Sequence, residues 1–261
     1  MRDAGAERLR ARLVREDLSP VEAARLAALV ELLLDRPAPP EPADRYPRFE
    51  PLRAALVGSV RDGSGERIED AFLELYCHLH GHEATYSPQE RGIVDRSGGY
   101  WAHAGGLSPV LKAPDWIGPE TVSADFGAGN GLQLLLVQAL APHRRSVQIE
   151  IAGDMIEAGR GLQAWLGVPH DRVTWRHADL TDVGPDDYDF IYLYRPLRPD
   201  GPGAAFYERF GRALAQHRRP VTIFSVADCL ARFLPGEFER VYFDGHLTCY
   251  RRSPTRPGAQ A

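Results

Sequence analysis

The spacing of hydrophobic residues along the chain changes near residue 121. Between residues 3 and 35, leucine and valine recur at helical intervals, and Ser19-Pro20 has the composition of a helix N-cap with proline at the first helical position. This stretch predicts two helices. A third helix is predicted from Glu66 to His80, because its large apolar residues fall on one face. After Thr121, short apolar runs alternate with helical stretches, which is typical of a parallel sheet with crossover helices.

The second half of the chain therefore predicts a doubly wound, Rossmann-like α/β fold with a mostly parallel seven-stranded sheet. An antiparallel C-terminal hairpin is expected, because Asp244-Gly245 between two apolar runs favours a two-residue type I′ turn. The predicted strands cover residues 122–125, 146–149, 173–176, 190–194, 221–225, 238–243 and 246–250. The predicted helices among them cover residues 131–141, 154–166 and 204–217, with a short one at 228–233.

Two stretches lack any regular pattern. Arg36 to Pro51 is rich in proline, which can hold neither a helix nor a central strand, so we expect a linker or a wrapping segment. Gly81 to Pro119 combines glycine pairs with tyrosine, tryptophan and histidine, as functional loops do. The predicted organisation is a helical extension with linker and substrate lid at 1–114, a ligand-binding domain at 115–252 and a disordered tail at 253–261.

Composition narrows the class of protein. The net charge of −5 disfavours a nucleic-acid partner, whose phosphates need Lys and Arg. Three cysteines at unrelated spacings disfavour a secreted disulfide framework. The first residues are charged and no run approaches the roughly 18 apolar residues of a membrane span, so we expect a cytoplasmic protein with no membrane contact.

The main chemical signal follows the first predicted strand. Its residues are Asp125-Phe126-Gly127-Ala128-Gly129-Asn130-Gly131, at the turn into a helix, where an open α/β sheet binds its ligands. A dinucleotide-binding fingerprint would need a third glycine at the position of Leu132 or Leu134. A triphosphate-binding loop would need a lysine directly after its last glycine, whereas the only lysine in the chain is Lys112. The motif therefore disfavours both NAD and nucleoside triphosphates as ligands.

From Thr121 to Arg251, about half the chain, the sequence resembles the class I S-adenosylmethionine-dependent methyltransferases. The likeness begins with the glycine motif just described. It continues with Glu150 at the end of the second strand and Asp179 after the third. The fourth predicted strand, within Asp-Tyr-Asp-Phe-Ile-Tyr-Leu-Tyr, completes four matches in the family's order.

The resemblance implies S-adenosylmethionine as cofactor and a role for each matched residue. Glu150 would accept from the ribose hydroxyls, and Asp179 would contact the adenine amino group. Backbone at Gly127, Gly129 and Gly131 would approach the methionine moiety, while Asp125 suits its ammonium or an ordered water. The structural alternatives are a turn residue for Asp125, an exposed strand-end carboxylate for Glu150 and a turn cap for Asp179.

The end of the fourth strand departs from the family's commoner patterns. Where amino methyltransferases often carry Asn or Asp, Pro, Pro and an aromatic residue, this chain has Tyr194-Arg195-Pro196-Leu197-Arg198-Pro199. We expect Arg195, with Arg198, either to orient an anionic acceptor or to pair with Asp189 or Asp228. The candidates for a catalytic base are His103, Asp228 and Tyr194.

The cluster from Cys77 to Glu83 has the residue types of a zinc site. His78 and His80 would point to different faces of a helix, and no second ligand pair follows at structural-zinc spacing. We therefore expect no metal here, a buried Cys77, and histidines that line or cap the substrate lid.

The sequence thus predicts a methyltransferase that acts on a small-molecule, anionic acceptor. One alternative is a protein, peptide or RNA acceptor in a groove lined by Arg195, Arg198, Arg218 and Arg219. Another is a non-catalytic partner subunit that keeps the fold but has no cofactor affinity or an occluded pocket. Residues 1–60 could serve as a lid or as a homodimerisation element, because their apolar helix face has no evident partner within the chain.

Overall fold

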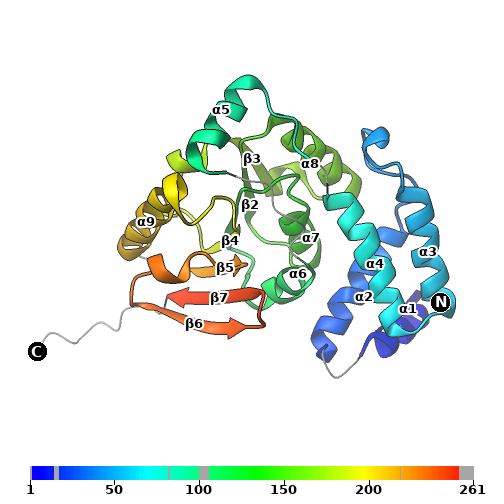
Figure 1. Ribbon diagram of the computed structural model, residues 1–261. Coiled ribbons are helices and arrows are strands. Elements are labelled where there is room, and N and C mark those ends of the chain that lie inside the picture. Colours follow the sequence, from blue (N-terminus) through cyan, green and yellow to red (C-terminus); the bar gives the residue numbers. More distant parts are fainter. Residues whose placement is uncertain (1, 15–17, 82, 100–105, 218, 253–261) are drawn as a thin grey trace, which may run out of the picture.

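The computed structural model describes residues 2–14, 18–81, 83–99, 106–217 and 219–252. The strands are β1 (Val122–Phe126), β2 (Arg145–Glu150), β3 (Val173–His177), β4 (Phe190–Tyr194), β5 (Thr222–Val226), β6 (Phe238–Phe243) and β7 (Leu247–Arg252). They form one sheet in the order β3-β2-β1-β4-β5-β7-β6, in which β7 runs against its neighbours (Figure 1). The predicted fold class is confirmed.

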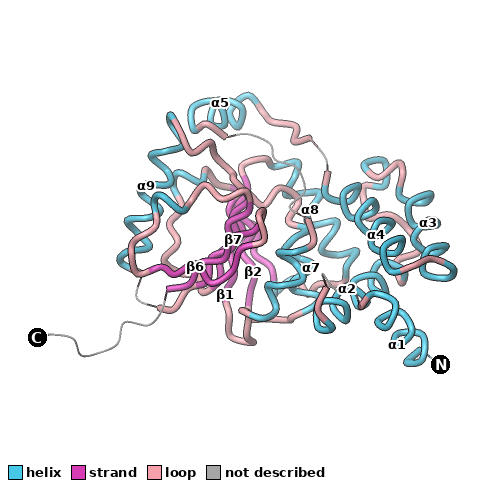
Figure 2. Tube along the Cα trace, turned by 60° about the horizontal axis from the view of Figure 1, so that its bottom comes forward, coloured by secondary structure: helices cyan, strands magenta, loops and turns pink. Residues whose placement is uncertain are grey.

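Helices cover both faces of this sheet. The three crossover helices are α7 (Leu132–Leu140), α8 (Gly153–Leu166) and α9 (Gly201–Gln216). Figure 2 shows α9 on one side of the sheet and α7 and α8 on the other. Side chains alternate along β4, so that Phe190 and Tyr192 join the core beneath α7 while Ile191 and Leu193 join the core beneath α9.

The N-terminal helices lie beyond α7 as seen from the sheet (Figures 1 and 2). They are α1 (Arg2–Leu13), α2 (Pro20–Leu34), α3 (Phe49–Asp62) and α4 (Gly65–His80). Helix α7 is apolar nearly all round, which suits a helix buried on every side, and its leucines share one core with Leu26 and Leu33 of α2 and Phe72 of α4. This partner within the chain removes the reason for expecting a homodimer through residues 1–60.

The proline-rich segment wraps α8. Trp165 Nε1 donates to the Ala38 carbonyl at 2.7 Å, and a Cβ on Gly161 would come within 2.0 Å of the Glu41 carbonyl oxygen. The prediction that helix is excluded up to Pro51 was wrong at its end, because α3 begins at Phe49. Pro51 falls in its first turn, where the missing N–H would have no partner in any case.

The stretch 81–119, predicted to be irregular, contains α5 (Pro88–Ser97) and α6 (Ser108–Lys112). Helix α5 starts with a capping box between Ser87 and Glu90. Single turns of 3₁₀ helix complete the described secondary structure, at η1 (Ala43–Arg45), η2 (Ala113–Asp115), η3 (His170–Arg172), η4 (Leu180–Asp182) and η5 (Ala231–Phe233).

The C-terminal hairpin differs from the prediction at its turn. Asp244 N–H donates to the Leu247 carbonyl, so the central residues are Gly245 and His246. Of these, only Gly245 has a positive φ, at 94°, whereas a type I′ turn needs two. The Asp244 carboxylate accepts from the N–H groups of His246 and Leu247 and thereby fixes the shifted turn.

Candidate functional site

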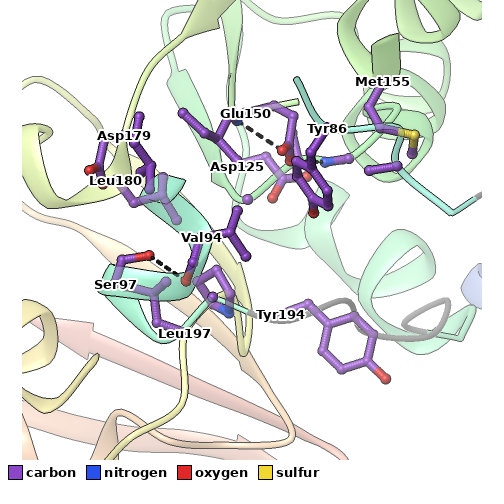
Figure 3. A pocket seen from close by; sticks show the side chains of 18 of the residues that line it. Tyr86, Val94, Ser97, Asp125, Glu150, Met155, Asp179, Leu180, Tyr194 and Leu197 are labelled. Carbon is purple, nitrogen blue, oxygen red and sulfur yellow. Dashed lines mark hydrogen bonds between the residues drawn. The ribbon is translucent and has the colours of Figure 1, made fainter. Parts of the chain in front are cut away.

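A pocket opens at the carboxyl ends of β1, β2 and β4, beneath α5. It includes the point between β1 and β4 where the strand order reverses, the usual ligand crevice of such sheets. Together with the solvent-filled space at its mouth, it measures about 970 Å³. Side chains of Asp125, Glu150, Asp179 and Tyr194 lie around it in Figure 3. The remaining lining comes from the glycine loop, the end of α4, the segment 84–99, and Gln133, Ile151, Met155, Leu180, Tyr192, Pro196 and Leu197.

The glycine loop takes backbone conformations that other residues adopt only under strain. The φ angles of Gly127, Gly129 and Gly131 are 84°, 57° and 67°. A Cβ on Gly127 would come within 2.7 Å of Pro196 Cβ, and one on Gly131 within 2.6 Å of the Trp175 ring. Gly127 and Gly129 line the pocket, while Gly131 is required for packing against β3.

Glu150 closes the loop from the neighbouring strand. The residue is 8% exposed, and its carboxylate accepts from the N–H groups of Gly129, Ile151 and Ala152 at 2.8–2.9 Å. Burial raises the pKa of Glu150, although these three donors offset part of the rise. A carboxylate offers about four acceptor positions, so about one remains for a ligand hydroxyl.

Asp125 lies on the floor of the pocket and is 2% exposed. Burial raises the pKa of its carboxyl well above the usual range, and the neighbouring Glu150 raises it further. In the described part of the chain, neither carboxyl belongs to an ion pair. Two buried acids without a cation make this end of the pocket favourable for a positively charged ligand.

Asp179 combines a structural contact with a place in the pocket. Its Oδ1 accepts from the Thr181 N–H at 2.8 Å, so it caps η4. It is half-buried beside Leu180 at the edge of the cavity (Figure 3). Asp179 therefore both caps a turn and lines the pocket.

Helix α5 bridges the pocket, held at both ends. At its start, the buried Glu90 carboxylate accepts from Gly153 N–H at 2.9 Å and contacts His177 Nε2 at 3.0 Å. Beyond its end, Gly99 pairs with Leu197 in an isolated antiparallel bridge, and Arg198 N–H donates to the Gly98 carbonyl. Burial alone would raise the pKa of Glu90, but the donors around it lower that pKa to about 2.

The predicted catalytic residues are not gathered at one place. Tyr194 lines the pocket, with His246 against its ring at a centroid distance of 5.8 Å. Arg195 is exposed outside the lining, with a φ of 43°, beside the Cys229 thiol. The Asp228 carboxylate accepts from Ser225, Leu230 N–H and the Tyr250 hydroxyl, away from the cavity. His103 lies outside the described residues.

The two acids suggested as partners of Arg195 have contacts elsewhere. Asp189 pairs with Arg219 at 3.3 Å and accepts from the Val122 N–H, at the amino edge of the sheet. Asp228 has the three donors described above.

The cluster at the end of α4 separates in the structure. The prediction that Cys77 is buried was wrong, because the buried stripe of α4 runs through Ile68, Phe72, Leu75, Tyr76 and Leu79 and leaves Cys77 exposed. His78 Nε2 accepts from the Arg48 N–H, whereas His80 lines the pocket. Within the described ranges, no group of three potential ligands lies close enough to hold a metal ion.

Sequence reasoning missed several lining residues. Gln133 and Tyr192 line the pocket. Tyr86 and Met155 lie on one side of Glu150 (Figure 3). Asn130, fully buried in the glycine loop, donates to the Leu79 carbonyl at 2.8 Å and ties the loop to α4. Gln133 carried a signal, since it is one of two polar residues, with Gln138, in an apolar helix; Tyr192 within a buried strand carried none.

Protein-family models give no match to this sequence, and no curated protein matches it. Solved structures with a related fold include an RNA methyltransferase from Salinibacter ruber in complex with S-adenosyl-L-homocysteine. It is 21% identical, over 69% of this chain and 98% of that chain, with a TM-score of 0.40.

A SAM-dependent methyltransferase from Geobacter sulfurreducens, also in complex with S-adenosyl-L-homocysteine, is 19% identical over 53% of this chain and 55% of that chain, with a TM-score of 0.39. A protein of the NADB-Rossmann superfamily from Streptococcus agalactiae is 13% identical over 56% and 68%, with a TM-score of 0.41. These structures are similar in fold only. Because one fold supports many activities, the residues of the pocket have to indicate the function of this chain.

None of the helices in the described ranges combines the length and apolar character needed to cross a membrane.

Proposed function

We propose that this protein is an S-adenosylmethionine-dependent methyltransferase that acts on a small-molecule acceptor. The observation that carries the proposal is the pocket itself, where the positive-φ glycine loop, Asp125 and Glu150 converge at the point of strand-order reversal. Three carboxyl groups line it, and no Lys or Arg is among the described lining residues, a composition that suits a sulfonium cation.

The residues fit the cofactor in shape as well as in charge. Because Gly127 and Gly129 lack a Cβ, backbone forms the wall where the methionine moiety would lie. Glu150 retains about one acceptor position for a ribose hydroxyl, and Asp179 with Leu180 lines the side proposed for adenine. Tyr86 and Met155 line the pocket on the opposite side of Glu150 from Asp179 and Leu180 (Figure 3).

When bound, S-adenosylmethionine would supply an electrophilic methyl group on a sulfonium. The protein's task is then positioning and exclusion of water, since an in-line displacement gains much of its acceleration from these. Helix α5, fixed at both ends, covers the cavity and serves both purposes. Tyr194, at the end of β4, is the predicted base that lines the cavity.

We propose a small acceptor for two reasons. Helix α5 covers the cavity, and the arginines do not gather on one surface. A groove for RNA or protein would need Arg195, Arg198 and Arg219 on one surface. Arg219 pairs with Asp189 at the amino edge of the sheet, whereas Arg195 and Arg198 follow β4 at the carboxyl edge. The described lining likewise offers no guanidinium for an anionic acceptor.

Calorimetric titration of S-adenosylmethionine and S-adenosylhomocysteine tests the proposal. We expect both to bind the wild type, and Gly129→Arg to abolish binding, because its side chain would extend toward Met155 in the pocket. Gly118→Arg is the matched control, since a Cβ there meets nothing within 4 Å and the residue lies outside the lining. Folded wild-type protein that binds neither compound would refute the proposal.

The acceptor class is tested separately. Radiolabelled methyl groups from the cofactor should enter the small-molecule fraction of a cell extract. Incorporation into the RNA or protein fraction instead would replace the proposed acceptor while leaving the cofactor unaffected.

A further inference from the structure

The turn η4 contributes to a second cavity as well as to the pocket beneath α5. Leu180 lines the pocket, whereas Thr181 and Asp182, the next two residues, line a cleft against the outer face of α9. We call this cavity the α9 cleft. With the solvent that fills its mouth, it measures about 920 Å³. Its walls are the segment 181–185 and the α9 residues Phe206, Arg209, Phe210, Arg212, Ala213 and Gln216.

The α9 cleft combines apolar surface with charge. Its apolar lining comes from both walls and consists of Val183, Pro185, Phe206, Phe210 and Ala213. Its charged lining consists of Asp182, Arg209 and Arg212, which leaves an excess of one positive charge. Apolar walls with a few charged groups are typical of small-molecule sites, and the sign of the charge favours an anionic ligand.

Arg209 connects the α9 cleft to the pocket beneath α5. Its Nη2 donates to the Thr181 carbonyl at 2.8 Å. The Thr181 N–H in turn donates at 2.8 Å to the carboxylate of Asp179, which lines the pocket. Because a guanidinium carries five N–H donors, Arg209 can hold the Thr181 carbonyl and still donate to a ligand.

Arg212 supplies a second guanidinium that the protein itself does not use. Within the described ranges, its side chain has no ion pair or hydrogen bond. Glu208 precedes it by four residues on α9, a spacing at which opposite charges often pair, yet the two side chains do not meet. Arg212 lines the cleft instead. The planar fork of a guanidinium matches the two oxygens of a carboxylate.

We propose that the α9 cleft binds an organic carboxylate with an apolar body, and that this ligand is coupled through η4 to the pocket beneath α5. The carboxylate accepts from Arg209 and Arg212, and the apolar body lies against Phe206 and Phe210. A ligand that fixes Arg209 also holds η4 in the conformation that lines the pocket. Occupation of either cavity then raises the affinity of the other, because such coupling is reciprocal. Binding in the cleft is independent of the proposed function, whereas the coupling rests on it.

Two matched probes test the site. 4-Phenylbutyrate carries the carboxylate, and 4-phenylbutanol has the same apolar body without the charge. Their affinities for the full chain are measured by ligand-observed NMR titration in the wild type, Arg212→Gln and Ala213→Leu. Arg160→Gln is the control, because Arg160 is an exposed residue of α8, on the opposite side of the sheet from α9 (Figure 2).

We expect Arg212→Gln to weaken 4-phenylbutyrate about tenfold and to leave 4-phenylbutanol unchanged, since a hydrogen bond between two charged groups is lost. Ala213→Leu should weaken both probes, because the larger side chain enters the cleft. Arg160→Gln should change neither. Gly129→Arg, which obstructs the pocket beneath α5, should leave the affinity of 4-phenylbutyrate unchanged.

The site is overturned if 4-phenylbutyrate does not bind, or if Arg212→Gln leaves its affinity unchanged. Loss of its binding in Gly129→Arg would likewise overturn the site, by placing the probe in the pocket.

The coupling is measured by titrating S-adenosylhomocysteine with and without saturating 4-phenylbutyrate. We expect the carboxylate to raise the affinity about fivefold or more in the wild type but not in Arg212→Gln. Equal affinities in the wild type would overturn the coupling. Failure of the proposed function gives a different result, in which S-adenosylhomocysteine does not bind at all while 4-phenylbutyrate still does.

Discussion

Glu90 allows a quantitative test of how the pocket cover is attached. Its side chain is 11% exposed, and its carboxylate accepts from the N–H groups of Ser87 and Gly153 at 2.7 and 2.9 Å and contacts His177. In Glu90→Gln, an amide NH₂ replaces one of the two oxygens. It must then face an N–H donor, which leaves that donor unpaired.

The lowered pKa sets the size of the effect. A tenfold change in acid strength corresponds to about 1.4 kcal/mol. Lowering the pKa of Glu90 from its ordinary 4.5 to about 2 therefore stabilises the folded state by about 3 kcal/mol. Because the folded-state pKa is the lower one, this contribution is complete above pH 4.5 and is lost as pH falls through 2. At pH 3 less than half of this stabilisation remains.

Urea denaturation at pH 7 and pH 3 measures the effect. We expect Glu90→Gln to unfold with about 3 kcal/mol less free energy than the wild type at pH 7, and the difference to fall by more than half at pH 3. Glu50→Gln, at an exposed first-turn position of α3, is the control and should change stability by less than about 0.5 kcal/mol. A difference of the same size at both pH values would refute the electrostatic reasoning.

Three further predictions concern other parts of the molecule. Gly127→Ala should lower the free energy of unfolding by about 1–3 kcal/mol more than Gly201→Ala. Both positions have a positive φ, but only a Cβ at position 127 would meet Pro196 within 4 Å. Equal losses in the two variants would contradict this reasoning. Asp228→Asn should lower the melting temperature and leave cofactor affinity unchanged, since the three donors to the Asp228 carboxylate lie outside the pocket. If the variant were stable and its pH–rate profile shifted, Asp228 would instead be the catalytic base. Trp165→Phe should cost about 1 kcal/mol and speed proteolysis of the segment around Ala38, whose carbonyl loses its donor; unchanged cleavage would show that the bond does not hold the segment.

The sheet could be predicted closely because each strand is a short buried run bounded by turn residues. All seven predicted strands match observed ones to within two residues at either end. Errors in the predicted helices arose at prolines, because proline breaks a helix interior but fits the first turn of a helix. Proline at position 51 was interpreted as excluding a helix, although it fits a first turn, and Ser87-Pro88 with Glu90 was a capping box within a stretch taken for loop.

The site could be predicted only for those residues that a local sequence pattern marks. Asp125, Gly127, Gly129, Glu150 and Asp179 line the pocket, whereas Gly131 does not. The glycine loop could be located by its place at the first strand-to-helix turn, and Glu150 and Asp179 by the resemblance to the methyltransferase family. The place of Tyr192 depends on strand register, which no local pattern encodes, and the polar character of Gln133 within an apolar helix marked the residue but not the pocket that it lines. Arg195 shows the converse, since its place after the fourth strand suggested a role at the cavity, whereas it is exposed beside Cys229.

The burial of α7 on all sides has a consequence for synthesis. Leu33 of α2 and Phe72 of α4 share one core with α7 and are made first, so this core stays incomplete until residues 132–140 follow. At roughly 5–20 residues per second, the interval is several seconds of translation. Over that time the nascent chain carries exposed leucine-rich helices, so we expect ribosome-associated chaperones to bind before the sheet closes, and the N-terminal helices to reach their final packing only with it.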